Sequence, residues 1–432
     1  MAAWSAVATT AQAGNGEISA GDYPTIQAAI DANPGRVVAV PPGDHAIGKT
    51  IRIDKPGGGL AGSGRIVMSD PGAAIVEIEH ARGVRLSGLT LTRAEGAMET
   101  GREGVLISDG RDITLDGLRV EDNRTRSGAI RVEGSHRVRI SRCEVRNYMS
   151  IAVDDRTRDA ANQGYAFRCI DGTGIVVDRS HGTLIEGCTI IEERLIPTPE
   201  LKAEHRLGTF TAKNPTKGAL VAQATWDAGY VNNWHQGSAL IVTGPTESAD
   251  TRILGNHIEN AAQGIDLHSD RVVVSNNIVT NSFIGMKAMH GSRHVLITGN
   301  QFSRNDLWAI GLMPGVASAP GNVDGGSIIA NNIISGFGAG HSAWIWKDAD
   351  RCPIRFDHGQ EPADPPLRDV IVTGNIVDDG RRDRAEGEPD RPRYRLAVRV
   401  EAGSGHSPEG LHFSDNLFHP GTEGISNVEL KP

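Results

Sequence analysis

Three ionisable side chains lie within one short stretch of the chain: Asp266, His268 and Lys287. Asp266 and His268 are two residues apart, the spacing at which both side chains of a β-strand point to the same face. Lys287 follows one local repeat later and is expected on the neighbouring strand, beside Asp266. Together a carboxylate, an imidazole and an ammonium can orient a base, accept a proton and neutralise developing negative charge. We predict that these three residues are catalytic. The alternative is a surface ion pair, worth about 0–1 kcal/mol, beside an unrelated histidine.

Further polar and aromatic residues are expected around this trio. His290 and Arg293 follow Lys287 at the end of its segment, and Asp178 falls at an equivalent outward position on an earlier strand. Trp234 and His235 end a long excursion of the chain, 191–237, that is rich in aromatics for this sequence. Exposed aromatic rings stack on sugar rings. We predict that these five residues bind substrate; the alternative for the excursion is that it packs a small core of its own.

Two consecutive carboxylates, Asp154 and Asp155, form a separate candidate site. Ca²⁺ prefers several oxygen ligands, which clustered carboxylates supply. These residues are therefore the predicted metal ligands, and calcium is the cofactor considered.

A short repeated unit must position all of these residues. Each unit has an alternating apolar segment followed by an apolar segment that ends in a Gly- or Asn-containing turn, with a period of roughly 20 to 24 residues where spacers are short. The turn-ending segments are 84–89, 113–118, 138–143, 184–188, 253–256, 272–276, 295–300, 328–331, 370–375 and 411–416. The alternating segments are 76–79, 105–108, 130–133, 175–178, 240–243, 265–268, 286–289, 310–313, 344–347 and 398–401. We predict a stacked solenoid of about ten coils.

Asparagines recur at the turns, as at Asn256, Asn276, Asn300 and Asn331. Asparagine tolerates the left-handed backbone region, and its side-chain amides can hydrogen bond from one coil to the next. We expect these residues to form a structural ladder rather than a site.

The two ends and the spacers complete the predicted organisation. Residues 1–20 are expected to be a signal remnant or a disordered tail, because 1–14 is small and apolar and ends in Ala-Gln-Ala without a charged start. Pro24 and Thr25 open a predicted amphipathic helix that caps the solenoid. Residues 21–432 are then one domain with long loops at 155–173, 191–237, 347–369 and 379–394. At the start of the first of these loops, 151–155 is read either as a strand or as part of the loop.

Composition excludes several classes of protein. The chain has 432 residues, 53 of them glycine, with 4% aromatics and a net charge of −9, which argues against a nucleic-acid partner. No apolar run is long enough for a transmembrane segment, so with the N-terminal pattern we predict a secreted or periplasmic protein. The four cysteines show neither a CxxC pair nor zinc spacing, and Cys143 and Cys188 occupy equivalent inward positions.

The repeats, the cap sequence Thr-Ile-Gln-Ala-Ala-Ile at 25–30 and the Val-Pro-Pro-Gly turn at 40–43 resemble the pectate-lyase-like superfamily. The resemblance covers roughly residues 22–425 and implies an all-β, right-handed parallel β-helix. It implies a carbohydrate-active protein, since the superfamily includes polysaccharide lyases, glycoside hydrolases, epimerases and fructan transferases. It also implies that the protein is a monomer or a homotrimer. Val153-Asp154-Asp155 resembles the paired aspartates of polygalacturonase-like hydrolases, but their Gly-His-Gly and Arg-Ile-Lys motifs are missing.

Three functions remain open from the sequence. The first is a polysaccharide lyase acting at a uronate-type sugar, with Lys287 or His268 as the base and the other, or Arg293, neutralising the carboxylate. The second is a glycoside hydrolase or glycosyl transferase that uses Asp266 with Asp178 or Asp155. The third is a non-catalytic carbohydrate-binding protein. All three predict a polysaccharide or oligosaccharide as the partner.

Overall fold

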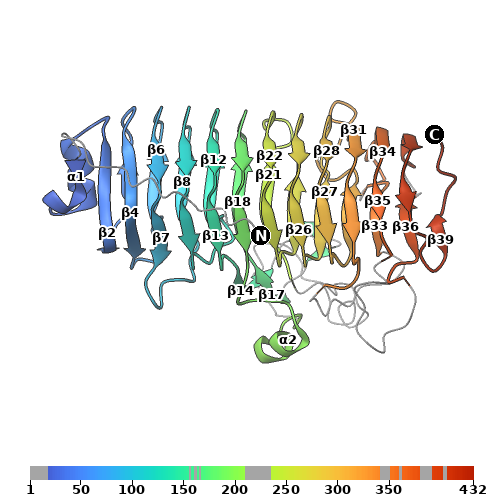
Figure 1. Ribbon diagram of the computed structural model, residues 1–432, viewed down its shortest axis with the longest axis horizontal. Helices are drawn as coiled ribbons and strands as arrows, with labels where there is room; N and C mark the ends of the chain where they lie inside the picture. The colour runs from blue at the N-terminus through green and yellow to red at the C-terminus, as the bar shows by residue number, and fades with distance from the viewer. Residues whose placement is uncertain are drawn as a thin grey trace, which may run out of the picture.

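The computed structural model describes residues 18–154, 157–159, 163–164, 167–209, 235–340, 351–359, 362–379, 392–401 and 406–432, with side chains left undescribed at 154–167. Nearly all regular structure in this part of the chain is short β-strand. The strands pair in parallel with the equivalent strands one coil before and one coil after. They stack along one axis into an elongated rod, with the chain passing from one end to the other (Figure 1).

One ladder of the solenoid, which we call the site sheet, carries the candidate residues. Among the described residues it holds twelve strands in sequence order. They are β3 (Ile51–Ile53), β5 (Val76–Glu79), β8 (Val105–Ser108), β11 (Ile130–Glu133), β18 (Thr173–Asp178), β21 (Ser238–Thr243), β24 (Gln263–Leu267), β27 (Ile284–Ala288), β30 (Trp308–Leu312), β33 (Cys352–Phe356), β36 (Leu396–Val400) and β39 (Gly424–Ser426).

Two further ladders close each coil. They join near the N-terminus through the long strands β2 (Val37–Ile47) and β4 (Gly59–Met68), and β1 (Ile18–Ser19) pairs with β2. The first contains β6 (Arg85–Ser87), β9 (Thr114–Asp116), β12 (Arg139–Ser141), β19 (Leu184–Glu186), β22 (Arg252–Leu254), β25 (Val273–Ser275), β28 (Leu296–Thr298), β31 (Gly325–Ala330), β34 (Arg368–Thr373) and β37 (Glu409–Ser414). The second contains β7 (Thr90–Arg93), β10 (Arg119–Glu121), β13 (Glu144–Arg146), β20 (Thr189–Ile191), β23 (His257–Glu259), β26 (Ile278–Thr280), β29 (Gln301–Ser303), β32 (Ile333–Ser335), β35 (Ile376–Val377) and β38 (Leu417–Phe418).

Alternation of side chains explains the core. Inward residues of the three ladders, such as Ile265, Val274 and Val279 in one coil, are fully buried. Each fills the centre of its coil and packs on its equivalents above and below, because neighbouring strands are only about 4.8 Å apart. Cys143 and Cys188 are also buried and unpaired, as expected for small inward side chains.

The asparagine ladder is real, but two of its members were assigned one residue too early. Buried side-chain amides pair in the series Asn256, Asn277, Asn300, Asn332, Asn375 and Asn416, with amide nitrogen to oxygen distances of 2.9 to 3.0 Å. Asn276 and Asn331 precede ladder positions and adopt left-handed backbone, with φ of 57° and 56°. Glycines fill the same place before Asn256, Asn300 and Asn375. The corner therefore needs a left-handed residue first and the ladder amide second.

The N-terminal end is covered by a short helix, α1 (Ile26–Ala32) (Figure 1). The Thr25 hydroxyl accepts a hydrogen bond from the Ala28 N–H at 3.0 Å and caps the helix, while Ile26 and Ala29 are buried against the first coil. The expected tail 1–20 reaches too far, because Ile18 and Ser19 already pair with β2 and Ala20 begins a 3-10 turn (Ala20–Asp22). Residues 1–17 lie outside the described part.

The excursions differ from the predicted loops in three places. Near 155–173, β14 (Ser150–Asp154) pairs antiparallel with β17 (Phe167–Asp171). Residues 151–154 are therefore a strand, but one that lies outside the three ladders. A second antiparallel pair is formed by β15 (Thr157–Asp159) and β16 (Gln163–Gly164). The excursion 191–237 contains α2 (Pro199–His205). The predicted loop 347–369 is wrong in part, because Cys352–Phe356 forms β33 and β34 begins at Arg368. The strand predicted at 344–347 lies outside the described residues, as does most of the loop 379–394.

Among the described residues, no helix has the length and apolar character needed to cross a membrane.

Candidate functional site

Asp266 and Lys287 are neighbours on the outer face of the site sheet. The register pairs Asp266 of β24 with Lys287 of β27, as the repeat predicted. Lys287 Nζ lies 3.5 Å from Asp266 Oδ2, and both side chains are largely shielded from solvent. The core side of the same strands holds Ile265, Leu267 and Met286, which fix the outward direction of the two charged residues.

His268 completes the predicted trio. It follows β24 directly, and its N–H donates to the Val242 carbonyl at 2.7 Å, so the ladder pattern continues through it. His268 Nε2 lies 3.0 Å from Asp266 Oδ1, but the two atoms do not meet in hydrogen-bond geometry, and neither has a hydrogen-bond partner among the described residues. His268 Nδ1 lies 3.3 Å from the Thr243 hydroxyl. Buried polar atoms without hydrogen bonds are uncommon away from functional sites.

The charges of this cluster control the state of Asp266. Burial by itself raises the pKa of the Asp266 carboxyl, but His268 and Lys287, with a smaller contribution from His290, outweigh it and hold that pKa well below its usual range. Asp266 is therefore a carboxylate at all physiological pH values. It can hold an imidazole and an ammonium in place, but it cannot act as a general acid there.

His290 joins the trio from the next turn. Its ring meets the His268 ring edge-on, with centroids 4.4 Å apart. The loop after β30 packs over it: the Ala317 N–H faces His290 Nδ1 at 3.4 Å, and a Cβ on Gly315 would lie 2.4 Å from the same atom. Asp324 ties this loop down, since Asp324 Oδ1 accepts the N–H groups of Gly291 and Ser292 at 2.9 Å each.

Trp308, which the sequence analysis did not single out, lies next to the trio. The register places Gly311 beside Lys287, and a Cβ on Gly311 would come within 2.9 Å of the Trp308 indole. The absence of a side chain there lets the indole lie against the sheet. The Arg355 guanidinium lies 5.1 Å from the ring centroid on the following coil. In the sequence, only the low aromatic content of the chain, 4%, makes a tryptophan such as Trp308 stand out as a candidate site residue.

Three other predicted substrate-binding residues are placed differently. Asp178 lies two coils before His268 and is held by Arg131 and Arg179, with nitrogen–oxygen distances of 2.7 and 3.3 Å. Arg293 lies at the turn and faces Asp270 at 3.6 Å. His235 is only 1% exposed, its Nε2 contacts Met149 Sδ at 3.2 Å, and burial lowers its pKa to about 3. A neutral, enclosed imidazole packs the fold and offers no surface to a ligand.

The remaining predicted residues cannot be placed. Trp234 and Asp155 lie outside the described residues, and for Asp154 only the backbone, at the end of β14, is described. The predicted calcium site on Asp154 and Asp155 therefore stays a prediction.

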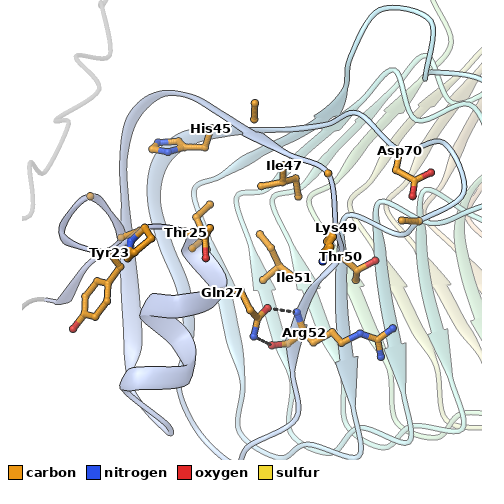
Figure 2. Close-up of a pocket in the computed structure, with 17 residues that line it drawn as sticks. Tyr23, Thr25, Gln27, His45, Ile47, Lys49, Thr50, Ile51, Arg52 and Asp70 are labelled. Atoms are coloured by element: carbon orange, nitrogen blue, oxygen red, sulfur yellow. Dashed lines mark hydrogen bonds between the residues drawn. The ribbon is translucent and has the colours of Figure 1, made fainter.

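A large cavity lies at the capped end, far from the trio. It has a volume of about 1140 Å³ and lies between α1 and residues 45–52, with Tyr23, His45 and Lys49 at its walls (Figure 2). Gln27 crosses it and bonds both backbone groups of Arg52, at 2.8 and 3.2 Å (Figure 2). Five strands of the site sheet lie between β3, which lines this cavity, and β24. The cavity is the seam between the cap and the first coil.

Comparison with known families matches part of the chain. A family model described as "Periplasmic copper-binding protein (NosD)" matches residues 211–309, less than a quarter of the chain. This stretch includes Asp266, His268 and Lys287. No protein of curated function matches the chain in sequence.

Copper does not fit the cluster of Asp266, His268 and Lys287 within the matched stretch. Copper sites use imidazole and sulfur ligands, whereas His268 here faces a carboxylate that also pairs with the Lys287 ammonium, a cation that would repel a metal ion. The described residues contain one group of three potential ligands close enough to share an ion, Asp378, Asp379 and His419, and it lies outside the match. The reaction proposed for the cluster of Asp266, His268 and Lys287 uses no metal ion.

Solved structures share the architecture over nearly the whole chain. An exopolygalacturonase from Thermotoga maritima has a TM-score of 0.54 at 11% identity, over 90% of this chain and 85% of its own. The surface adhesin PfbA of Streptococcus pneumoniae has a TM-score of 0.55 at 13% identity, over 96% and 93%. A DFA-IIIase from Arthrobacter chlorophenolicus A6 has a TM-score of 0.53 at 12% identity, over 93% and 89%. At this identity the likeness establishes the fold alone: the chain is a parallel β-helix, as the sequence predicted.

Proposed function

We propose that the protein is a carbohydrate-active enzyme that cleaves an acidic polysaccharide by β-elimination at a uronate-type sugar. The observation that carries this proposal is the cluster of Asp266, His268 and Lys287, in which a carboxylate that is ionised at physiological pH lies beside an imidazole and an ammonium on an outer face. Trp308 on the next coil is only partly buried, so the part of its indole that neither Arg355 nor the sheet covers is proposed to contact a sugar ring.

We assign a role to each group from its position. Asp266 orients His268 through Nε2, which leaves Nδ1, facing the Thr243 hydroxyl, as the basic atom. His268 Nδ1 takes the proton alpha to the sugar carboxylate. The electron pair of that C–H bond forms a carbon–carbon double bond as the glycosidic C–O bond breaks, and the leaving oxygen takes a proton from water. Lys287 lies beside the negative charge that develops on the sugar carboxylate and stabilises it.

Hydrolysis on the same scaffold is the second candidate, and it is favoured by the solved structures of hydrolases that share the fold. Hydrolysis by the usual route needs two carboxyl groups about 5 to 10 Å apart, one of which must be protonated. Asp266 stays ionised, and the next outward carboxylate described on this side, Asp178, lies two coils away in ion pairs with arginines. This arrangement suits elimination better than hydrolysis.

One assay separates the candidate functions. Purified protein is incubated with polyuronates and with neutral glucans, with and without chelator, while ultraviolet absorbance and reducing ends are followed together. Elimination raises both signals on a polyuronate, and hydrolysis raises reducing ends alone. Binding without either signal would leave the non-catalytic carbohydrate-binding function. The chelator arm tests the predicted calcium dependence.

Export to the periplasm or the cell exterior, where such polymers are found, is part of the same proposal. Its support is the apolar N-terminal pattern ending in Ala-Gln-Ala and the family description quoted above. A monomer or homotrimer remains the predicted assembly.

A further inference from the structure

A line of outward positions runs from the catalytic cluster toward the C-terminal end of the site sheet. The register aligns Lys287 of β27 with Gly311 of β30, then Arg355 of β33 and Arg399 of β36. Three coil steps of about 4.8 Å put Arg399 roughly 14 Å from Lys287 along the rod axis. The Trp308 indole covers the Gly311 position between them. A short extended oligosaccharide can span this line.

A small cavity of about 220 Å³ opens at the far end of this line. Its walls are Arg351, Arg395, Leu396, Arg399, Glu423 and Asn427. Three guanidinium groups and one carboxylate thus surround a space large enough for one anionic group. Arg351 directly precedes β33 and Arg395 directly precedes β36, so the rigid site sheet positions both.

Of the three arginines that line the cavity, Arg399 has terminal nitrogens that can bind a ligand. Arg395 Nε is held by Glu423 at 2.6 Å, and Arg351 Nε donates to the Asp306 carbonyl at 3.0 Å. Arg399 contacts Glu401 through Nε. Among the described residues, neither terminal nitrogen of Arg399 has a hydrogen-bond partner, and its side chain is 23% exposed.

The two terminal nitrogens of an arginine form a planar fork that matches the two oxygens of a carboxylate or of a sulfate ester. Glu401 on the Nε side holds the plane of this fork in place. Because the space in front of it is shared with two more guanidinium groups, a neutral hydroxyl gains little there, while an anion gains charge-assisted hydrogen bonds.

We propose that the cavity of Arg351, Arg395 and Arg399 is a subsite that binds an anionic substituent of the polysaccharide, three coils from the catalytic cluster. The inference rests on the proposed function for its substrate, and it deepens that function by making Arg399 the residue that selects an acidic sugar at this distance. The ligand group is a carboxylate or a sulfate ester, which share this chemistry.

Equilibrium binding tests the subsite without requiring turnover. Titration calorimetry is performed on the full chain and on Lys287→Ala, with three probes of equal length: an oligogalacturonate, a sulfated carrageenan oligosaccharide and a maltooligosaccharide. We expect at least one acidic probe to bind, with an affinity that falls as salt is raised, and the neutral probe to bind at least tenfold more weakly. The acidic probe that binds identifies the substituent.

Arg399→Gln is expected to weaken the acidic probe about tenfold or more, and Arg399→Lys to restore part of the loss. Arg271→Gln, which removes an arginine paired with Asp250 and Asp270 outside the site sheet, is the matched control and leaves the affinity unchanged. Thermal unfolding confirms that each variant is folded.

Equal affinity for acidic and neutral probes, unchanged affinity in Arg399→Gln, or no binding of either acidic probe overturns the subsite. Failure of the proposed elimination is a separate result: acidic probes would still bind and still depend on Arg399, while no unsaturated product would form.

Discussion

Asp266 and Lys287 hold the same outward position in neighbouring coils, and their charged groups meet 3.5 Å apart beneath His268 and His290. The pair is largely buried, so its partners cannot be exchanged for water at low cost. An isolated surface ion pair would show neither this burial nor the second contact of Asp266 with His268. The relationship makes Asp266 the residue on which the cluster depends.

Asp266→Asn should abolish the ordering of the cluster. Without the carboxylate, His268 loses its orienting partner and Lys287 loses its counter-charge, so activity falls by about 10²- to 10⁴-fold. Stability falls by about 3 kcal/mol, because a buried cation is left unpaired. Asp250→Asn breaks an exposed pair with Arg271 and should cost no more than about 1 kcal/mol. Urea unfolding and steady-state rates measure both effects; equal effects of the two variants would remove Asp266 from its assigned role.

Lys287→Met should separate chemistry from folding. The ammonium is expected to act on the substrate carboxylate, so the turnover number falls by at least about 10²-fold on a polyuronate. The methionine chain fills similar space beside Gly311, but the buried Asp266 carboxylate loses a cationic partner, so the free energy of unfolding should also fall by about 3 kcal/mol. Turnover is therefore measured at a temperature at which thermal unfolding shows the variant to be folded, and kcat should still collapse. A variant with normal turnover would exclude Lys287 from the chemistry.

Asp324 should make stability depend on pH near neutrality. Burial raises the pKa of Asp324 to about 7, although Ser318 and the N–H groups of Gly291 and Ser292 bond its carboxylate and oppose the rise. Because the folded pKa lies above the unfolded one, the contribution is fully present below about pH 4 and is lost as pH rises through 7. The slope is about 1.4 kcal/mol per pH unit in that window. Unfolding free energies at pH 5 and 8 should converge in Asp324→Asn; an unchanged pH dependence would contradict the assignment.

Asp266 acts on stability in a different and lower pH window. Its folded pKa is depressed, so its contribution is present above the ordinary aspartate pKa near 3.9 and is lost only as pH falls further. It contributes no slope between pH 5 and 8, and the two carboxyl groups can be distinguished in one titration series.

Trp308→Ala should weaken substrate binding more than turnover. Loss of the indole removes a stacking surface worth about 1 kcal/mol or more, so KM rises at least about fivefold on a polymer. Trp308→Phe keeps an aromatic face and is the matched control. Since Trp308 also packs against Phe283, Ile284 and Leu307, the unfolding temperature is measured in parallel. A fall in kcat at constant KM would place the residue in the chemistry instead.

The asparagine corner offers a test of the fold itself. Asn277→Ala removes a buried amide that bonds Asn300 and the Ile253 carbonyl, and should cost about 2–4 kcal/mol. Asn276→Gly, one residue earlier, replaces a left-handed asparagine with the residue that other coils use there, and should be near neutral. Chemical denaturation compares the two. Equal costs would mean that the ladder amides do not stabilise the coils.

Much of this fold could be predicted from the sequence because every coil of a solenoid repeats the same pattern of apolar residues and turn residues. Alternation at 265–268 and 286–289 gave the register of Asp266 with Lys287 directly, since equivalent residues of successive coils must stack. Where consecutive asparagines occur, as at 276–277 and 331–332, the pattern alone could not tell the left-handed residue from the ladder amide. Only the backbone angles separate them.

The rest of the site could not be predicted, because it depends on contacts between individual side chains that the repeat pattern does not show. Trp308 reaches the outer face because Gly311, three residues later, leaves room for its ring. His235 and Arg293 looked equally available in the sequence, yet one is enclosed beside Met149 and the other faces Asp270. The strand at Cys352–Phe356 was missed because 344–347 alternates equally well. When a long insertion contains two apolar segments, as here at 344–347 and 352–356, the sequence pattern does not show which of them pairs in the site sheet.

Cleavage of a polyuronate in heavy-oxygen water tests the elimination most directly. Mass spectrometry of the products distinguishes the two reactions, because elimination breaks the C–O bond without adding solvent oxygen, whereas hydrolysis adds one atom per cleavage. We predict unsaturated oligosaccharides that carry no solvent oxygen from the cleavage step, and none of these products from Lys287→Met. Saturated products that each contain one heavy oxygen would contradict the elimination and assign the cluster to hydrolysis.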